Sequence, residues 1–310
     1  MIALSLLAIL ALACSLPVFL SMQASPDPTS TPTSSVNSLP DFTPPPTSTP
    51  ISVPISSTSP TATTGVVRAP TGQTTRTLAP SSTPASGEAP RFDPLEARLI
   101  TNGSRDQPYI ALTFDLCQKP EYPAGFDEGI FAALTEKDAP ATFFLGGDWM
   151  RTHPDETRRL AANPEFELGN HSWSHPDLDG LPEAEISAEV LRTQDLLFQL
   201  TGRQNRLFRL PSGIYNDLVL DTIASHGLYT IQWDVVTADP VPDNLADNIL
   251  RIVQEEAQNG SIIIMHANGR GWHTAEALPQ IIDYLRSQGY TLVTISQLLG
   301  LEPVPTPAGG

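Results

Sequence analysis

The sequence predicts an α/β fold, a distorted (β/α)7–8 barrel, preceded by an apolar N-terminal segment and a disordered linker. From about residue 92 onward, short β-branched or aromatic runs alternate with longer helical patterns. Strands that alternate with helices in this way pair in parallel through helical crossovers. About seven or eight such units within roughly 200 residues favour a barrel over an open sheet.

The predicted elements follow one another from Tyr109 to Val293. Strands are expected at Tyr109–Asp115, Ala141–Leu145, Phe166–Asn170, Leu207–Arg209, Tyr229–Trp233, Ser261–Met265 and Tyr290–Val293. Helices are expected at Gly125–Lys137, Pro154–Asn163, Pro182–Leu200, Asn216–His226, Asn244–Gln258 and Thr274–Gln288. In such a barrel, catalytic groups lie at the carboxyl ends of the strands.

The first 90 residues have a different composition. Residues 2–20 are almost wholly apolar, which is typical of a secretory signal or an uncleaved membrane anchor. The small residues before Cys14 also resemble a lipoprotein box. Residues 25–90 are dominated by Pro, Ser and Thr and cannot bury enough apolar surface to fold. We therefore expect a signal or anchor over 1–24, a disordered linker over 25–90, a folded domain over 91–300 and a flexible tail over 301–310, with the domain secreted or held at the cell surface.

The charge balance excludes a nucleic-acid-binding protein, because the formal net charge is −17 and phosphate recognition needs clustered Lys and Arg. The folded region has no Gly-x-Ser-x-Gly elbow and no glycine fingerprint after a strand, which excludes a serine hydrolase and a dinucleotide fold. Of the two cysteines, Cys14 and Cys117, only the second lies in this region, so no disulfide can form within it. We expect a monomer whose only membrane contact is its N-terminal segment.

Two motifs at predicted strand ends carry the first candidate residues. Asp115 ends an apolar strand, where a rim carboxylate is a candidate catalytic group. The alternative is an Asp that caps the next turn. His171 and His175 have the i, i+4 spacing that places two imidazoles on one face of a helical turn, as metal ligation requires. The alternative is a pair of surface histidines.

Three later segments add polar groups in similar positions. Arg209 follows a short strand and could orient a carboxylate, and Gly213 would let backbone amides approach an oxyanion. His266 ends the apolar run that begins at Ile262 and could act as a general acid if a carboxylate such as Asp239 keeps it charged. Taken singly, Arg209 and Gly213 could belong to an ordinary turn, and His266 could be a core histidine whose hydrogen bonds are satisfied.

The ordered set resembles the NodB-type polysaccharide deacetylases, carbohydrate esterase family 4, over roughly residues 105–300. The residues that carry the resemblance are Thr113-Phe114-Asp115, His171-x-x-x-His175-Pro176, Arg209-x-Pro211-x-Gly213, the Asp239 segment and Ile264-x-His266. The resemblance implies a distorted (β/α) barrel and a divalent metal, often zinc. It implies a hydrolase that removes N-acetyl groups from a glycan such as peptidoglycan, a chitin-like polymer or an exopolysaccharide.

The resemblance also implies a role for each matching position. His171 and His175 correspond to two metal ligands, and Asp115 corresponds to the base that activates water. The other positions correspond to the residue that orients the base (Arg209), the general acid (His266), the carboxylate that tunes it (Asp239), the oxyanion turn (the Ser212 N–H, with Gly213) and a wall of the acetyl pocket (Ile264).

Two positions depart from the family pattern. Leu116 stands where a second Asp usually binds the metal, so the site lacks that ligand. Strand alternation would place Cys117 on the same side as Asp115, and a thiolate is a good zinc ligand. Asp127, Asp148 or a water could equally fill the gap, and a small buried thiol is the plain alternative for Cys117. Pro240 stands where the family commonly has Trp, which predicts a wider acetyl pocket.

The leading hypothesis is hydrolysis of an acetamide on a cell-wall or extracellular polysaccharide. The departures at Leu116 and Pro240 favour a second hypothesis, a hydrolase of a small amide or cyclic imide on the same scaffold. The third hypothesis is a glycan-binding module without catalysis. Retention of the whole proton-transfer set argues against it, because binding alone needs none of those groups.

Overall fold

The computed structural model describes residues 99–119 and 124–304. The predicted signal or anchor and the predicted linker lie outside the described residues, as does the end of the predicted tail. None of the helices in the described ranges is long and apolar enough to cross a bilayer.

In the part of the chain that the structure describes, eight strands form one sheet, and every pairing between these strands is parallel. They are β1 (Tyr109–Leu116), β2 (Ala141–Leu145), β3 (Phe166–Asn170), β4 (Leu207–Phe208), β5 (Tyr229–Thr230), β6 (Val235–Val236), β7 (Ile262–His266) and β8 (Thr291–Leu292). The strand order is β5-β4-β3-β2-β1-β7-β6, and β8 pairs with the start of β1. The chain closes part of the remaining gap through single bridges, Ile100 to Ile231 and Asn102 to Ser261. The predicted distorted barrel is confirmed.

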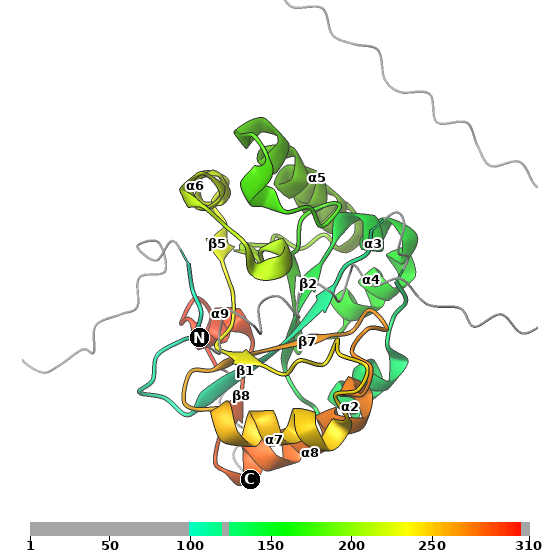
Figure 1. Ribbon diagram of the computed structural model, residues 1–310, viewed down its shortest axis with the longest axis vertical. Helices are drawn as coiled ribbons and strands as arrows, with labels where there is room; N and C mark the ends of the chain where they lie inside the picture. Colours follow the sequence, from blue (N-terminus) through cyan, green and yellow to red (C-terminus); the bar gives the residue numbers. More distant parts are fainter. Residues whose placement is uncertain (1–98, 120–123, 305–310) are drawn as a thin grey trace, which may run out of the picture. The chain divides into compact units, whose positions relative to one another are not determined.

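Helices connect the strands and cover the outside of the sheet. They are α2 (Glu128–Glu136), α3 (Gly147–Thr152), α4 (Pro154–Ala162), α5 (Glu183–Thr201), α6 (Asp217–Ser225), α7 (Ala246–Glu256), α8 (Thr274–Ser287) and α9 (Ile295–Leu298). Figure 1 shows α2, α7 and α8 together on one side of β1 and β7, and α5 with α6 towards the opposite end of the domain. The six predicted helices are all present, with ends within two residues of those expected except the start of α2, which begins three residues later than predicted. The short helices α3 and α9 and the two-residue β6 were not expected.

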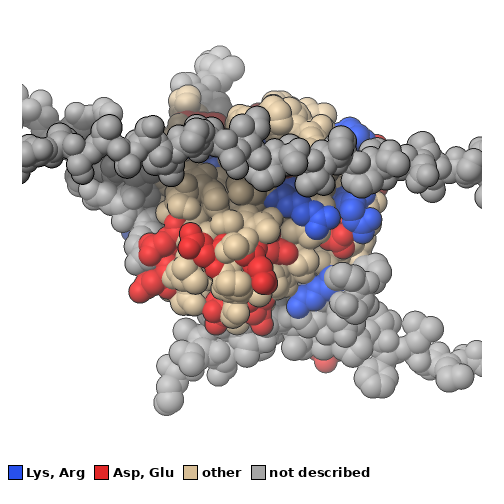
Figure 2. All heavy atoms as spheres, turned by 90° about the horizontal axis from the view of Figure 1, so that it is seen from above, with Lys and Arg blue, Asp and Glu red and all other residues tan. Residues whose placement is uncertain are grey.

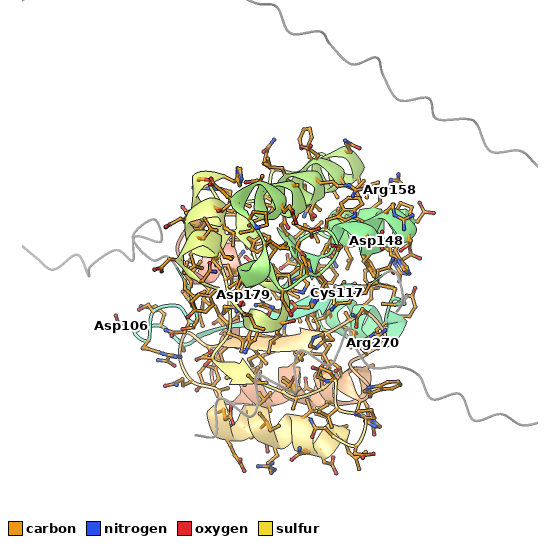
Figure 3. The ribbon with its side chains drawn as sticks, turned by 45° about the horizontal axis from the view of Figure 1, so that its top comes forward. Asp106, Cys117, Asp148, Arg158, Asp179 and Arg270 are labelled. Atoms are coloured by element: carbon orange, nitrogen blue, oxygen red, sulfur yellow. The ribbon has the colours of Figure 1, made fainter. Side chains whose placement is uncertain are left out.

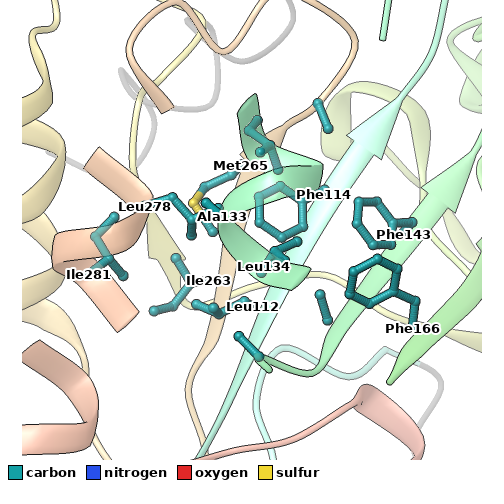
Figure 4. Close-up of a cluster of buried hydrophobic side chains, with 14 of the residues drawn as sticks. Leu112, Phe114, Ala133, Leu134, Phe143, Phe166, Ile263, Met265, Leu278 and Ile281 are labelled. Atoms are coloured by element: carbon teal, nitrogen blue, oxygen red, sulfur yellow. The ribbon is translucent and has the colours of Figure 1, made fainter. Parts of the chain in front are cut away.

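The core lies between the sheet and its outer helices. Leu112, Phe114 and Leu116 alternate along β1 with polar Thr113 and Asp115, so the strand directs its apolar side chains to the helices and its polar ones to the barrel interior. Figure 4 shows Phe114 beside Phe143, with ring centroids 5.2 Å apart. Burial of each such side chain contributes about 1.5–3 kcal/mol. This packing fixes β1, and with it the direction of Asp115.

Candidate active site

The parallel register gathers the predicted site residues at one end of the sheet. Asp115 lies opposite His266 in the pairing of β1 with β7. Asn170, the residue before His171, pairs with Leu145 on one side and with Phe208, the residue before Arg209, on the other. The carboxyl ends of β1, β3, β4 and β7 therefore bring together side chains that are up to 151 positions apart in the sequence, from Asp115 to His266.

Asp115 and Arg209 form a buried ion pair. Arg209 Nη1 donates to Asp115 Oδ1 at 2.9 Å and to Thr113 Oγ1 at 2.9 Å. Arg209 is fully buried, and its guanidinium lies 4.0 Å from the centre of the Phe144 ring. Burial raises the pKa of Asp115, but the charge and hydrogen bond of Arg209 lower it more, so the pKa of Asp115 lies below its usual value. The carboxylate is thus held ionised and in one orientation.

His266 and Asp239 form a second buried pair. Asp239 Oδ1 lies 3.0 Å from His266 Nδ1, and Asp239 Oδ2 accepts from the His266 backbone N–H at 2.7 Å. The Thr274 hydroxyl donates to the same Oδ2 at 2.7 Å. Burial lowers the pKa of His266, but the charge and hydrogen bond of Asp239 raise it above its usual value. The imidazole therefore keeps a proton to higher pH than a free histidine does.

His171 and His175 converge as predicted, but through a loop and not through a helical turn. Their ring centroids lie 5.0 Å apart. The backbone between them bends through left-handed conformations at Ser172 (φ 61°) and His175 (φ 57°), so the expected helical geometry was wrong. The spacing still brings the imidazoles together because two sharp bends replace the turn of helix.

Both imidazoles are in the form that binds metals. Burial lowers the pKa of His171 and lowers the pKa of His175 well below its usual value, which keeps the rings neutral. His171 Nδ1 donates to the Arg209 carbonyl at 3.0 Å, which leaves Nε2 with its lone pair, 3.7 Å from Asp115 Oδ2. Within the described residues, Nδ1 of His175 is buried without a hydrogen-bond partner, an orphaned atom that a bound cation would satisfy.

Cys117 is the candidate third ligand that the structure places beside these rings. Ligand atoms of Cys117, His171 and His175 all lie within 4.8 Å of one another. Figure 3 labels Cys117 at the end of β1 and Asp148 on α3. Asp148 pairs with Arg151 and Asp127 caps α2, so these two alternatives are used elsewhere. With Cys117 as a thiolate, the sulfur and the two imidazoles would suit a divalent cation such as zinc.

Leu116 occupies the position of the family's second Asp, and its side chain belongs to the apolar core. Its side chain is fully buried in the cluster that packs the sheet against the helices. It faces away from Asp115, since neighbouring side chains of a strand point to opposite sides.

The candidate oxyanion turn follows Arg209. Pro211, Ser212 and Gly213 form a 3₁₀ turn in which Ser212 has φ 56° and Gly213 has φ 73°. The positive φ at position 213 favours glycine, and a side chain there would also press against Trp233. Ile264 is fully buried and points to the same side of β7 as His266, two residues further on. Pro240, beside Asp239, is buried as well.

Several residues that build this site received no role from the sequence motifs. Thr113 bonds Arg209, and Asn170 holds the histidine loop by accepting from the Ser172 N–H at 2.9 Å. Both are polar residues on the inner or terminal positions of buried strands, so strand alternation could have identified them. Glu189, in the middle of α5, contacts the same loop and carries no comparable sequence signal.

The outer surface is not uniformly charged. Figure 2 shows acidic side chains gathered in one area of the visible face and basic side chains in another. The exposed aromatic side chains include Tyr215, two residues after Gly213, and Trp272, six residues after His266. Aromatic rings on loops next to the site provide flat apolar surface for a ligand.

Comparisons with known proteins agree with this geometry. The polysaccharide deacetylase family model matches residues 102–231. Among relatives, the uncharacterised protein YlxY of Bacillus subtilis is 30% identical over 67% of this chain and 62% of its own length. The peptidoglycan-N-acetylglucosamine deacetylase of Bacillus cereus is 30% identical over 64% of this chain and 70% of its own length. This chain thus spans less than two thirds of the length of YlxY.

A solved structure with the same fold is that of BA3943, described as a CE4 family pseudoenzyme from Bacillus anthracis. It has a TM-score of 0.59 and 29% identity, over 65% of this chain and 68% of that chain. A mutant of BA3943 with restored enzymatic activity also has a TM-score of 0.59, with 30% identity over 65% of this chain and 71% of that chain. The strand-end residues, the fold and these relatives agree, and the chain belongs to the polysaccharide deacetylase family, carbohydrate esterase family 4.

Proposed function

We propose that this chain is a metal-dependent hydrolase that removes N-acetyl groups from a cell-wall polysaccharide, with peptidoglycan as the first substrate to test. One observation carries the proposal. An ionised carboxylate (Asp115), a proton-bearing imidazole (His266) and two neutral imidazoles (His171 and His175) converge at one end of the sheet. A binding module needs no such combination of base, acid and ligands.

The residues present suit a divalent cation. His171 and His175 would hold it, with Cys117 as the third ligand in its thiolate form. Cys117 could take this role only as a reduced thiol and not as part of a disulfide, so metal analysis needs a reductant. When bound, the cation would polarise the acetamide carbonyl and increase the acidity of water. Two nitrogen ligands and one sulfur favour zinc over magnesium or calcium.

The proton-transfer residues would act from opposite sides of the acetamide. Asp115, oriented by Arg209, would take a proton from the attacking water. The backbone N–H of Ser212, in the left-handed turn after Arg209, would donate a hydrogen bond to the oxyanion, so no side chain is needed for this role. His266, kept protonated by Asp239, would donate its proton to the leaving amine.

The apolar residues 2–20 and the Pro/Ser/Thr-rich residues 25–90 support a location outside the cell. A cell-wall substrate fits this location, because it is fixed at the surface and an extended spacer would let the domain reach it.

One observation favours a second candidate, a glycan-binding pseudoenzyme. Position 116 provides no carboxylate ligand, and BA3943 is described as a pseudoenzyme of the same family. The cation site of this chain would then be too weak to support turnover.

Acetate release from peptidoglycan and from chitin oligomers, measured with zinc, cobalt, manganese or magnesium added, tests these candidates. Release with at least one metal supports the deacetylase. Binding of glycan without release under any metal supports the pseudoenzyme. Turnover of small amides or cyclic imides with no activity on glycans would replace both by the remaining hypothesis.

A further inference from the structure

The loop between the two imidazoles has a backbone that its own residues do not favour. Ser172 and His175 have φ values of 61° and 57°, in the left-handed region that residues other than glycine rarely adopt. A loop with two such residues persists only when its surroundings fix it. The contacts that fix this loop are therefore part of how the imidazoles come together.

Glu189, on the inner side of α5, makes three of these contacts. Its Oε2 accepts from the backbone N–H of Trp173 at 2.7 Å and from that of Ser174 at 2.8 Å. Its Oε1 accepts from the Ser174 hydroxyl at 2.8 Å. Hydrogen bonds to a carboxylate are roughly twice as strong as those between neutral groups. One side chain thus holds both residues at the centre of the loop.

The opposite side of the loop rests against the start of α3. The N–H of Gly147 donates to the Ser172 carbonyl at 2.9 Å, and the N–H of Asp148 donates to the Trp173 carbonyl at 2.9 Å. A Cβ at Gly147 would lie 2.2 Å from the Trp173 ring, so the packing here is tight. Arg192, also on α5, stacks 3.5 Å above that ring. The loop is clamped between two helices.

We propose that Glu189 is a positioning residue that holds the His171–His175 loop in its metal-binding conformation through the main chain. The inference rests on the proposed function, in which these imidazoles bind a cation. Glu189 is not itself a ligand, because both of its oxygens are used by the loop. Nδ1 of His175 has no partner, and its backbone N–H bonds within the loop, to Ser172 Oγ at 3.1 Å. The direction of that ring therefore follows the backbone that Glu189 holds.

Two substitutions separate positioning from charge. Glu189→Ala removes all three acceptors. Glu189→Gln loses the charge but keeps an oxygen that can accept from both backbone N–H groups, and its amide can donate to the Ser174 hydroxyl. Positioning predicts that Gln stays close to wild type, whereas an electrostatic role would make Gln as harmful as Ala. Glu185→Ala is the matched control, since Glu185 is an exposed glutamate one turn earlier on the same helix.

The experiment uses the full chain with a reductant present and measures two quantities. Zinc affinity, from calorimetric titration, is expected to fall by about 10- to 100-fold in Glu189→Ala, and to stay near wild type in Glu189→Gln and Glu185→Ala. Hydrogen exchange of the Trp173 and Ser174 amides in the metal-free protein is expected to accelerate only in Glu189→Ala. If that variant does not fold, Glu189→Asp, whose carboxylate is one methylene shorter, replaces it with the same expected losses.

The outcomes distinguish this inference from the proposed function. If wild type binds zinc and Glu189→Ala binds it equally well, the inference is overturned while the function stands. Equal losses in Ala and Gln overturn positioning in favour of charge. A wild-type chain that binds none of zinc, cobalt, manganese and magnesium overturns the proposed function and, with it, the metal-binding role of the loop.

Discussion

The site has two halves that are built differently. The proton-transfer half consists of Asp115, Arg209, His266 and Asp239, and the metal half consists of His171, His175 and Cys117. In the proton-transfer half, Asp115 and Arg209 pair with each other, and both oxygens of Asp239 hold His266. In the metal half, Nδ1 of His175 is buried without a partner in the described structure, and the backbone beside it bends through left-handed conformations.

Under the proposed function, the difference indicates which half of the site needs a ligand. The proton-transfer half is complete in the folded chain, because each charge there has an opposite charge or a hydrogen bond. The metal half has buried neutral nitrogens and no carboxylate among its three candidate ligands. Under the proposed function, a cation would supply the partner that Nδ1 of His175 lacks within the described residues.

The largest expected effect comes from removing the base. Asp115→Asn keeps the shape of the side chain but cannot take a proton, so kcat for acetate release should fall by about 10² to 10⁴. Zinc binding should persist, because Asp115 is not one of the three candidate ligands. Asp179→Asn, at an exposed carboxylate in the turn after the histidine loop, serves as the control. Full activity of Asp115→Asn would mean that another group is the base.

A carboxylate added at position 116 tests the directions of neighbouring side chains. Leu116→Asp places a charge in the apolar cluster and should lower the free energy of unfolding by about 3 kcal/mol or more, without tighter zinc binding. Cys117→Asp points its carboxylate towards His171 and His175 and should retain zinc. Denaturant unfolding and zinc titration measure both. Tighter zinc binding in Leu116→Asp with unchanged stability would show that position 116 reaches the site.

Zinc itself should stabilise the fold. At a free concentration of about 100 times Kd, zinc should raise the free energy of unfolding by about 2.7 kcal/mol, since it binds only the folded loop. His175→Gln should lose most of this gain but unfold like wild type without metal. Chemical unfolding with zinc and with a chelator, both with a reductant present, measures the effect. An equal gain in both proteins would place zinc elsewhere.

The smallest expected effect concerns pH. His266 must be protonated to act as an acid, and its pKa is raised, so activity should persist above the usual pKa of histidine and decline as pH rises through the raised value. Asp239→Asn removes the charge that raises this pKa, so the decline should begin at lower pH. Rates of acetate release between about pH 5 and pH 8 test this. An unchanged alkaline limb would exclude His266 as the titrating acid.

Much of the fold could be predicted from the sequence, because its signals are local. The apolar run ending at Asp115 and the one ending at His266 identify buried parallel strands, and polar residues after them identify the reactive end of the barrel. The helix α3 and the strand β6 could not be predicted in this way. Helix α3 has six residues and no side-chain cap, and β6 has two residues and is fixed by its pairing with β7.

The site was predictable in its residues more than in its geometry. The spacing of His171 and His175 indicated a shared ligand, but the loop that joins them is hydrogen-bonded to Glu189 and to the start of α3, which the motif does not contain. Strand alternation would place Cys117 on the side of Asp115 if the strand continued; β1 ends at Leu116, and Cys117, the next residue, lies near the imidazoles. The sequence left Cys117, Asp127 and Asp148 open as the third ligand. In the structure Asp127 caps α2 and Asp148 pairs with Arg151, both through local contacts, and Cys117 lies beside the imidazoles.

The parallel arrangement of the strands has a practical consequence for protein engineering. All candidate reactive groups follow the carboxyl ends of strands, whereas the turns that lead into β2 and β7, residues 137–140 and 257–261, lie at the opposite end. The turn before β7 is tied to the start of β1, because Gly260 exchanges main-chain hydrogen bonds with Gly103 and Tyr109 and Ser261 bridges to Asn102. The turn before β2, residues 137–140, is therefore the better place to insert a fluorescent tag or a surface-attachment sequence, at the end of the sheet away from Asp115 and His266.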